Sequence, residues 1–169
     1  REIVSAMVRI QGELKVAVYA PDGNYTCREM ARDHFGVGTP LSLHSSARAV
    51  LNSVQDGKAT VGILPFPEDG EAAPWWTVLA SMKTERRLSV CARLPVVPMA
   101  VDRHDAALCV AKIEVDQSGD DKSFFVLHTS PQIDRTRLQE AITAAGITLL
   151  RLVGINEQLE DDTMFLLEL

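Results

Sequence analysis

Two adjacent carboxylates, Glu68 and Asp69, lie in a loop rich in proline and glycine at 65–70, directly after an apolar run. Open α/β sheets bind their ligands at strand ends of this kind. Paired carboxylates can act as general acid and base, but adjacent acids in a loop are usually solvated. We therefore expect loop 65–70 to contact a ligand, with an ordinary exit from a strand as the alternative. The catalytic residues stay unknown.

Two expected helix starts, near Thr26 and near Ser46, add a second kind of chemistry. Helix starts are positively polarised and attract anions. Both should point towards the ends of the first two strands, where they would form an anion-binding rim with loop 65–70. The candidate ligand-binding residues of this rim are Pro21, Gly23, Asn24, Thr26, Ser46, Pro65, Glu68, Asp69 and Gly70.

Other site types find little support in the composition. The four histidines, at 34, 44, 104 and 128, lack the spacing of metal ligands, and no cofactor motif is present. Cys27, Cys91 and Cys109 are widely spaced, which favours buried free thiols in a reducing cytoplasm. A net charge of −6 disfavours nucleic acid, and no apolar run of membrane-spanning length occurs.

The first half of the chain alternates between strand and helix patterns. Strands are expected at 14–20, 41–44 and 59–66, and helices at 25–35 and 47–54, with Gly36 ending the first helix. This order predicts a parallel sheet with right-handed crossovers. Before it, 1–11 has helical spacing and is expected to end a helix whose body lies upstream.

The pattern changes after residue 76. Longer strands are expected at 87–94 and 106–115, joined by a turn at 102–105, and 117–121 is the best candidate boundary. Beyond it we expect a β-α-β-β order, like the first two-thirds of a ferredoxin-like module. Its strands are expected at 123–128, 148–153 and 163–169, and its helix at 134–145. Whether the last two strands form a separate domain or extend the first sheet is open.

Two more segments have alternative interpretations. Trp75 and Trp76 either cover the open side of the first sheet's lobe or form an exposed partner-binding pair. The acids at 157–162 most simply form a solvated loop.

Several stretches of the chain resemble motifs of a known protein family and follow one another in the order that the family has. APDGNYT at 20–26 resembles the Gly-Pro-x-Gly-Thr-Phe-Ser motif of prephenate dehydratases, and LPFPEDG at 64–70 resembles their Val-Pro-Ile-Glu-Asn-Ser loop. GDDKSFFVL at 119–127 resembles the start of their regulatory ACT domain. REIVSA at 1–6 is similar to the end of the last helix of a chorismate mutase, an activity often fused upstream of the dehydratase.

The resemblance implies an α/β fold made of one lobe of a periplasmic-binding-protein-like dehydratase domain, followed by an ACT-like region. The end of an upstream helical domain would occupy 1–12, the lobe 13–116 and the ACT-like region, truncated, 117–169.

The motifs nevertheless depart from the family. The place of its Thr-Arg-Phe motif reads DAALC at 105–109, and the loop's Asn-Ser reads Glu68-Asp69. In the ACT-like region, 130–138 lacks the glycine of the Pro-Gly-Ala-Leu turn, and GINE at 154–157 replaces Glu-Ser-Arg-Pro. A second lobe over the site has no room in the chain. Because dehydration of the prephenate dianion needs a positioned acid and a closed, dry site, we expect the activity to be lost.

The resulting hypothesis is a degenerate dehydratase-like, ligand-sensing module, linked to a chorismate mutase in phenylalanine biosynthesis. Its ligand would be prephenate, chorismate or phenylalanine, and the resemblance implies a homodimer. The cysteines favour the cytoplasm, and no cofactor is expected because no cofactor motif is present. One alternative is an active prephenate dehydratase with a replacement acid such as Glu68 or His104. Another is a non-catalytic protein-interaction domain, in which the tryptophans would be exposed.

Overall fold

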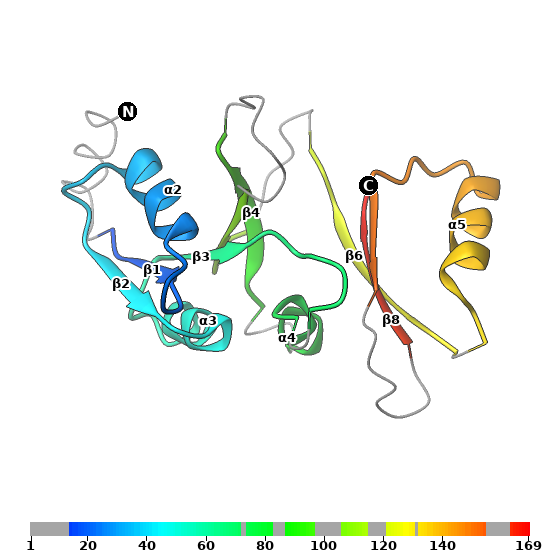
Figure 1. Cartoon of the computed structure of the whole chain (residues 1–169), viewed down its shortest axis with the longest axis horizontal. Coiled ribbons are helices and arrows are strands. Elements are labelled where there is room, and N and C mark those ends of the chain that lie inside the picture. Colours follow the sequence, from blue (N-terminus) through cyan, green and yellow to red (C-terminus); the bar gives the residue numbers. More distant parts are fainter. Residues whose placement is uncertain are drawn as a thin grey trace. The chain divides into compact units, whose positions relative to one another are not determined.

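The computed structural model describes residues 14–71, 74–82, 87–96, 106–114, 121–130, 132–154 and 163–169. Figure 1 shows its helices and strands in chain order. The elements are β1 (Val16–Tyr19), α2 (Thr26–Phe35), β2 (Leu41–His44), α3 (Ala47–Gln55), β3 (Val61–Pro65), α4 (Trp76–Ser81), β4 (Ser89–Leu94), β5 (Ala107–Ala111), β6 (Phe124–Thr129), α5 (Arg135–Ala144), β7 (Arg151–Gly154) and β8 (Thr163–Glu168).

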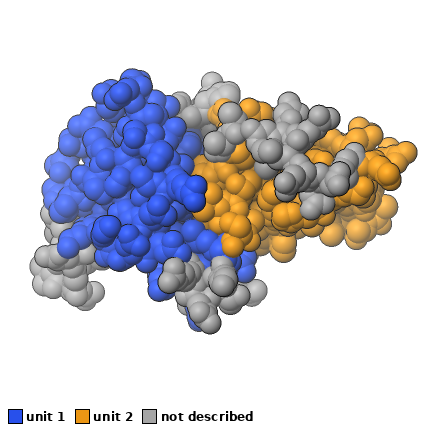
Figure 2. All heavy atoms as spheres, turned by 90° about the horizontal axis from the view of Figure 1, so that it is seen from below, with its two compact units in different colours: residues 1–66, 82–115 blue, residues 67–81, 116–169 orange. Residues whose placement is uncertain are grey.

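The chain divides into two compact units. The first comprises Arg1–Phe66 and Met82–Val115, and the second comprises Pro67–Ser81 and Asp116–Leu169 (Figure 2). Each unit has its own sheet.

The first unit contains a five-stranded sheet of order β2-β1-β3-β5-β4. β1 pairs in parallel with β2 on one side and with β3 on the other. β5 runs antiparallel to both β3 and β4, so β4 has the same direction as β3. Four strands therefore end at one edge of this sheet.

Helices cover both faces of the first sheet. On one face, α2 packs Cys27 and Ala31 against strand residues such as Val18 and Ile63. On the other face α3 lies very close to β3, because a Cβ added at Gly62 would fall 2.8 Å from Val50 Cγ1. A sheet buried on both faces requires strands that are apolar at nearly every position, as β3 and β5 are.

The second unit contains a three-stranded antiparallel sheet of order β6-β8-β7. α5 lies on one face of it (Figure 1). Leu138 and Ile142 of the helix pack there against Leu152, Phe165 and Leu167 of the sheet.

The structure confirms the expected α/β class, with a parallel-rich sheet followed by a β-α-β-β region. All eight expected strands and the three expected helices within the described residues are present, with ends shifted by a few residues. It also answers the open question on the last two strands, because β7 and β8 pair with β6 and not with the first sheet.

Other expectations were incomplete, wrong or untested. Helix α4 was not expected, because its six residues are too few to show a helical period. The exposed interpretation of the tryptophans is wrong, since Trp75 and Trp76 are only 4% and 3% exposed. The expected helix end at 1–11, the turn at 102–105 and the acidic loop at 157–162 lie outside the described residues.

Candidate functional site

The carboxyl edge of the first sheet collects three of the predicted ligand-contacting segments. Tyr19 and His44 are partners at the ends of β1 and β2, and the Ala20 amide donates to the His44 carbonyl at 2.8 Å. β3 runs parallel to β1 and ends at Pro65. Because the three strands run the same way, the segments that follow them begin at one edge.

The turn before α2 is built around Asn24. The backbone amide of Asn24 donates to the Pro21 carbonyl at 3.0 Å. Gly23 adopts φ +80°, a conformation that favours glycine. The Asn24 Oδ1 accepts from the Thr26 amide at 3.1 Å, whereas Tyr25, at the N-cap position, makes no side-chain cap bond. Asn24 therefore caps α2 from the position before the N-cap residue Tyr25. Thr26 is the first helical residue, in agreement with the helix start expected near it.

Ser46 is the N-cap of α3, at the helix start expected near it. Its hydroxyl oxygen accepts from the Ala49 amide at 3.3 Å. This bond engages the oxygen as an acceptor and leaves the hydroxyl hydrogen able to donate. Ser46 thus orients a helix start at the carboxyl edge.

Arg93 is a cation at the same edge that was not anticipated from the sequence. It lies in β4 opposite Leu108, one position before the Leu94–Ala107 pair, while Ala107 also faces Pro65. The exposed Arg93 guanidinium sits 4.8 Å from the centre of the Phe66 ring. Only the strand order shows that Arg93 lies at this edge, because the sequence around an isolated arginine in a strand does not indicate where its strand lies in the sheet.

Strand β5 occupies the place where the resemblance puts the Thr-Arg-Phe motif. Ala106 and the whole of β5 are buried, with Ala107 between Pro65 and Leu94. The side chains at 106–109 are two alanines, a leucine and a cysteine, and none of them carries a hydroxyl or a guanidinium.

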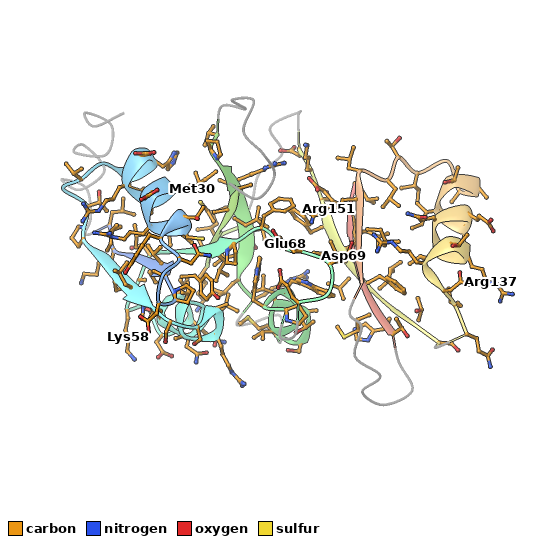
Figure 3. The ribbon with its side chains drawn as sticks, in the orientation of Figure 1. Met30, Lys58, Glu68, Asp69, Arg137 and Arg151 are labelled. Carbon is orange, nitrogen blue, oxygen red and sulfur yellow. The ribbon has the colours of Figure 1, made fainter. Side chains whose placement is uncertain are left out.

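The remaining predicted residues, Glu68, Asp69 and Gly70, belong to the second unit. Figure 3 marks Glu68 and Asp69 on this loop and Arg151 at the start of β7. Of the predicted rim, Pro21, Gly23, Asn24, Thr26, Ser46 and Pro65 lie at one edge of the first sheet, whereas Glu68, Asp69 and Gly70 belong to the second unit. Gly70, with φ +76°, provides the turn after Asp69.

Both oxygens of the Asp69 carboxylate are held by the second unit. Arg135 Nη1 donates to Oδ1 and Oδ2 at 3.1 Å each, and Nη2 donates to Oδ2 at 3.1 Å. The Gly154 amide donates to Oδ1 at 3.0 Å. Sequence reasoning missed these partners, which lie 66 and 85 positions away.

The two acids of this loop are shifted in opposite directions. Burial tends to raise the pKa of Asp69, but the Gly154 amide and the charges of Arg135 and Arg151 outweigh it and hold the pKa below its ordinary value. Burial raises the pKa of Glu71, whose Oε1 accepts from the Glu68 amide at 2.7 Å. Asp69 is thus a fixed anion, and Glu71 is the loop acid more inclined to hold a proton.

The cysteines lie together in the first unit. Cys27 and Cys109 are buried in one core cluster, with Cys91 packed against it. Burial raises the pKa of Cys27 to about 11 and that of Cys109 to about 12, so these thiols are poor nucleophiles. The described residues contain no group of histidine, cysteine and acidic side chains arranged to hold a metal ion. They also include no helix long and apolar enough to cross a bilayer.

Comparison with known proteins identifies related folds. No family profile matches the chain, and no curated protein matches it. A prephenate dehydratase from Streptococcus mutans is 14% identical over 92% of this chain and 82% of its own, with a TM-score of 0.56. A prephenate dehydratase from Arthrobacter aurescens, in complex with L-phenylalanine, is 13% identical over 92% of this chain and 80% of its own, with a TM-score of 0.60.

A third solved structure, GqqA, is described as a novel type of quorum quenching acylase. It is 17% identical over 93% of this chain and 80% of its own, with a TM-score of 0.63. At these identities the three neighbours establish a shared fold.

Proposed function

We propose that this chain is a ligand-sensing module with the fold of prephenate dehydratases, in which the dehydratase chemistry has been lost. It would serve aromatic amino-acid biosynthesis as part of a chorismate mutase-linked protein. In this proposal 1–12 ends an upstream helical domain, 13–116 is the dehydratase-like lobe and 117–169 is the ACT-like region. Prephenate, chorismate or phenylalanine is the proposed ligand, and a homodimer the proposed assembly.

The proposed loss of dehydratase activity is supported by the side chains of β5 at the carboxyl edge of the first sheet. Elimination of water and carbon dioxide from prephenate requires an acid placed at the leaving hydroxyl. The strand residue beside Pro65 is the alanine at 107, and its neighbours at 106 and 108 are also apolar. This strand therefore brings neither a proton donor nor a hydroxyl to the position where the family has its threonine.

Asp69 does not replace that acid. Its carboxylate is held by a guanidinium and an amide, and its lowered pKa keeps it ionised at neutral pH. An ionised, doubly held carboxylate cannot protonate a leaving group.

Retention of ligand binding is supported by the carboxyl edge of the first sheet. Two capped helix starts and the guanidinium of Arg93 lie at this edge. Helix starts and arginine are the groups that proteins commonly use to bind carboxylates. All three candidate ligands carry at least one carboxylate, and prephenate and chorismate each carry two.

A thermal-shift series with prephenate, chorismate, L-phenylalanine and L-tyrosine tests the proposal, together with a turnover assay for phenylpyruvate. A ligand that binds only the folded state raises the melting temperature with its occupancy. We expect a saturable shift with at least one of these ligands and no phenylpyruvate. Arg93→Gln should reduce that shift, whereas Arg32→Gln, an exposed arginine in the last turn of α2 and far from that helix's start, should leave it unchanged.

The enzyme alternative needs a replacement acid such as Glu68 or His104, and Glu71 adds a third candidate. Its raised pKa makes it the described loop residue best suited to donate a proton, so an active prephenate dehydratase would use it as the acid. Phenylpyruvate formation that disappears in Glu71→Gln would establish this alternative and reject the sensor.

Two further functions are less well supported. A pure protein-interaction domain would expose large aromatic side chains, whereas both tryptophans are buried. An acylase, as GqqA is described, would need an activated nucleophile. The Ser46 oxygen is engaged as a helix cap, and the buried thiols have raised pKa values. The Ser42 hydroxyl lies 3.3 Å from His44 Nε2, in an exposed contact.

A further inference from the structure

The donors around Asp69 form an arrangement suited to a free carboxylate. Arg135 presents two nitrogens to the two oxygens of the Asp69 carboxylate. This is the bidentate geometry in which arginine commonly binds carboxylates. The Gly154 amide adds a third donor at the end of β7. Arg151, at the start of the same strand, contributes a further positive field at the Asp69 carboxylate.

These donors are positioned without help from Asp69. The Arg135 Nη2 also donates to the Leu152 carbonyl, so β7 itself holds the guanidinium. The helix that carries Arg135 is anchored by Asp134, whose side chain accepts from the Arg137 amide at 2.8 Å. The Gly154 amide is fixed by the pairing of β7 with β8. The donor set would therefore persist if the Asp69 side chain left.

Asp69 can be exchanged at modest cost. Its side chain is 50% exposed and that of Arg135 is 47% exposed, so water and small solutes reach the pair. Ion pairs at such exposure contribute little net stability. The advantage of Asp69 over a dissolved carboxylate is its attachment to the chain, which acts as a high effective concentration.

We propose that Arg135 and the Gly154 amide form a binding site for a small carboxylate, which the chain fills with its own Asp69. A dissolved carboxylate that enters this site displaces Asp69 and releases the loop that carries it. Binding at this site would thereby change the loop that follows β3. This inference does not depend on the identity of the ligand at the carboxyl edge of the first sheet.

The experiment uses sodium acetate as the probe and the backbone amide signal of Gly154, followed by NMR, as the readout. Asp69→Ala removes the internal carboxylate and leaves the donors. We expect acetate, and not sodium chloride at equal ionic strength, to shift the Gly154 signal saturably in this variant. The apparent affinity should be at least about fivefold higher than in the unaltered chain, where Asp69 competes.

Three further variants make the outcome decisive. Asp69→Ala/Arg135→Gln should lose the acetate response, whereas Asp69→Ala/Arg137→Gln, altered on an exposed arginine of the same helix (Figure 3), should keep it. Asp69→Asn offers the same test with a side chain of the original size, should the alanine variant fold poorly. An equal acetate response with and without Asp69, or no response in either Asp69 variant, would overturn the proposal.

Discussion

Replacing Asp69 by asparagine removes one charge and keeps the size of the side chain. The carboxylate accepts three contacts of 3.1 Å from Arg135 and one of 3.0 Å from Gly154. An ion pair as exposed as this one contributes about 0.2–1 kcal/mol. The charge-assisted bond from a partly exposed amide adds about 1 kcal/mol. Because asparagine keeps one acceptor oxygen, we expect Asp69→Asn to lower the free energy of unfolding by about 1 kcal/mol.

The effect should depend on pH in a defined direction. Burial acts to raise the pKa of Asp69, but the Gly154 amide and the two arginines lower it below the ordinary value of 3.8. A group whose pKa is lower in the folded state stabilises that state fully above its unfolded pKa. The stabilisation is lost as the pH falls through the folded value. The difference between the unaltered chain and Asp69→Asn should therefore be complete at neutral pH and fade below pH 3.8.

Urea denaturation at neutral and acid pH measures this difference, and hydrogen exchange of the Gly154 amide measures the same bond locally. Asp33→Asn is the matched control, since Asp33 is an exposed acid of α2 in the other unit. Equal stability of Asp69→Asn and the unaltered chain, with unchanged exchange at Gly154, would refute the reasoning. A difference of the same size in acid would show that something other than the carboxylate charge is responsible.

Four further substitutions or treatments have defined outcomes. Because burial raises the pKa of Glu71 above 4.5, the charged form of Glu71 is unfavourable in the folded state at neutral pH. In urea denaturation, Glu71→Gln should therefore raise the free energy of unfolding by up to about 0.5 kcal/mol at neutral pH and leave it unchanged below pH 4.5. Gly62→Ala should destabilise by about 1–3 kcal/mol in the same assay, because its Cβ would fall 2.8 Å from Val50 Cγ1, and stability equal to the parent would contradict the close packing of α3. Ser46→Ala should cost about 1 kcal/mol, whereas Ser46→Asp, which can also cap, should not. Cys109, with a pKa raised to about 12 by burial, should react with iodoacetamide at neutral pH only after denaturation, as mass spectrometry of the labelled chain would reveal.

The sequence predicted the first sheet well because its signals are local. Ser46 precedes a helical pattern and caps α3, and Gly36 follows one and ends α2. The apolar run of β3 fits a strand buried on both faces, where Gly62 lies under α3. Each of these signals lies within a few residues of the feature that it predicts.

The parts that sequence reasoning missed depend on pairing between distant strands. Arg93 joins the carboxyl edge only because β4 lies outside β5, and β5 lies beside β3. Nothing near Arg93 indicates that order. The six residues of α4, which include the buried Trp76, are too few to show a helical period.

The Asp69 contact changes the meaning of the motif departures. Judged from sequence, an aspartate in place of the family's serine adds a charge that repels carboxylate ligands. In the structure that charge is neutralised by Arg135, from the stretch that lacks the family's Pro-Gly-Ala-Leu glycine. The second donor is Gly154, the first residue of the stretch that replaces Glu-Ser-Arg-Pro. Asp69, Arg135 and Gly154, which are far apart in the chain, thus meet in one contact within the second unit. The Gly154 amide has Asp69 Oδ1 as its acceptor, whereas Arg135 contacts both oxygens of the same carboxylate. Asp69→Ser, which removes that acceptor, should therefore expose the Gly154 amide to exchange more than Arg135→Gln, which leaves it in place.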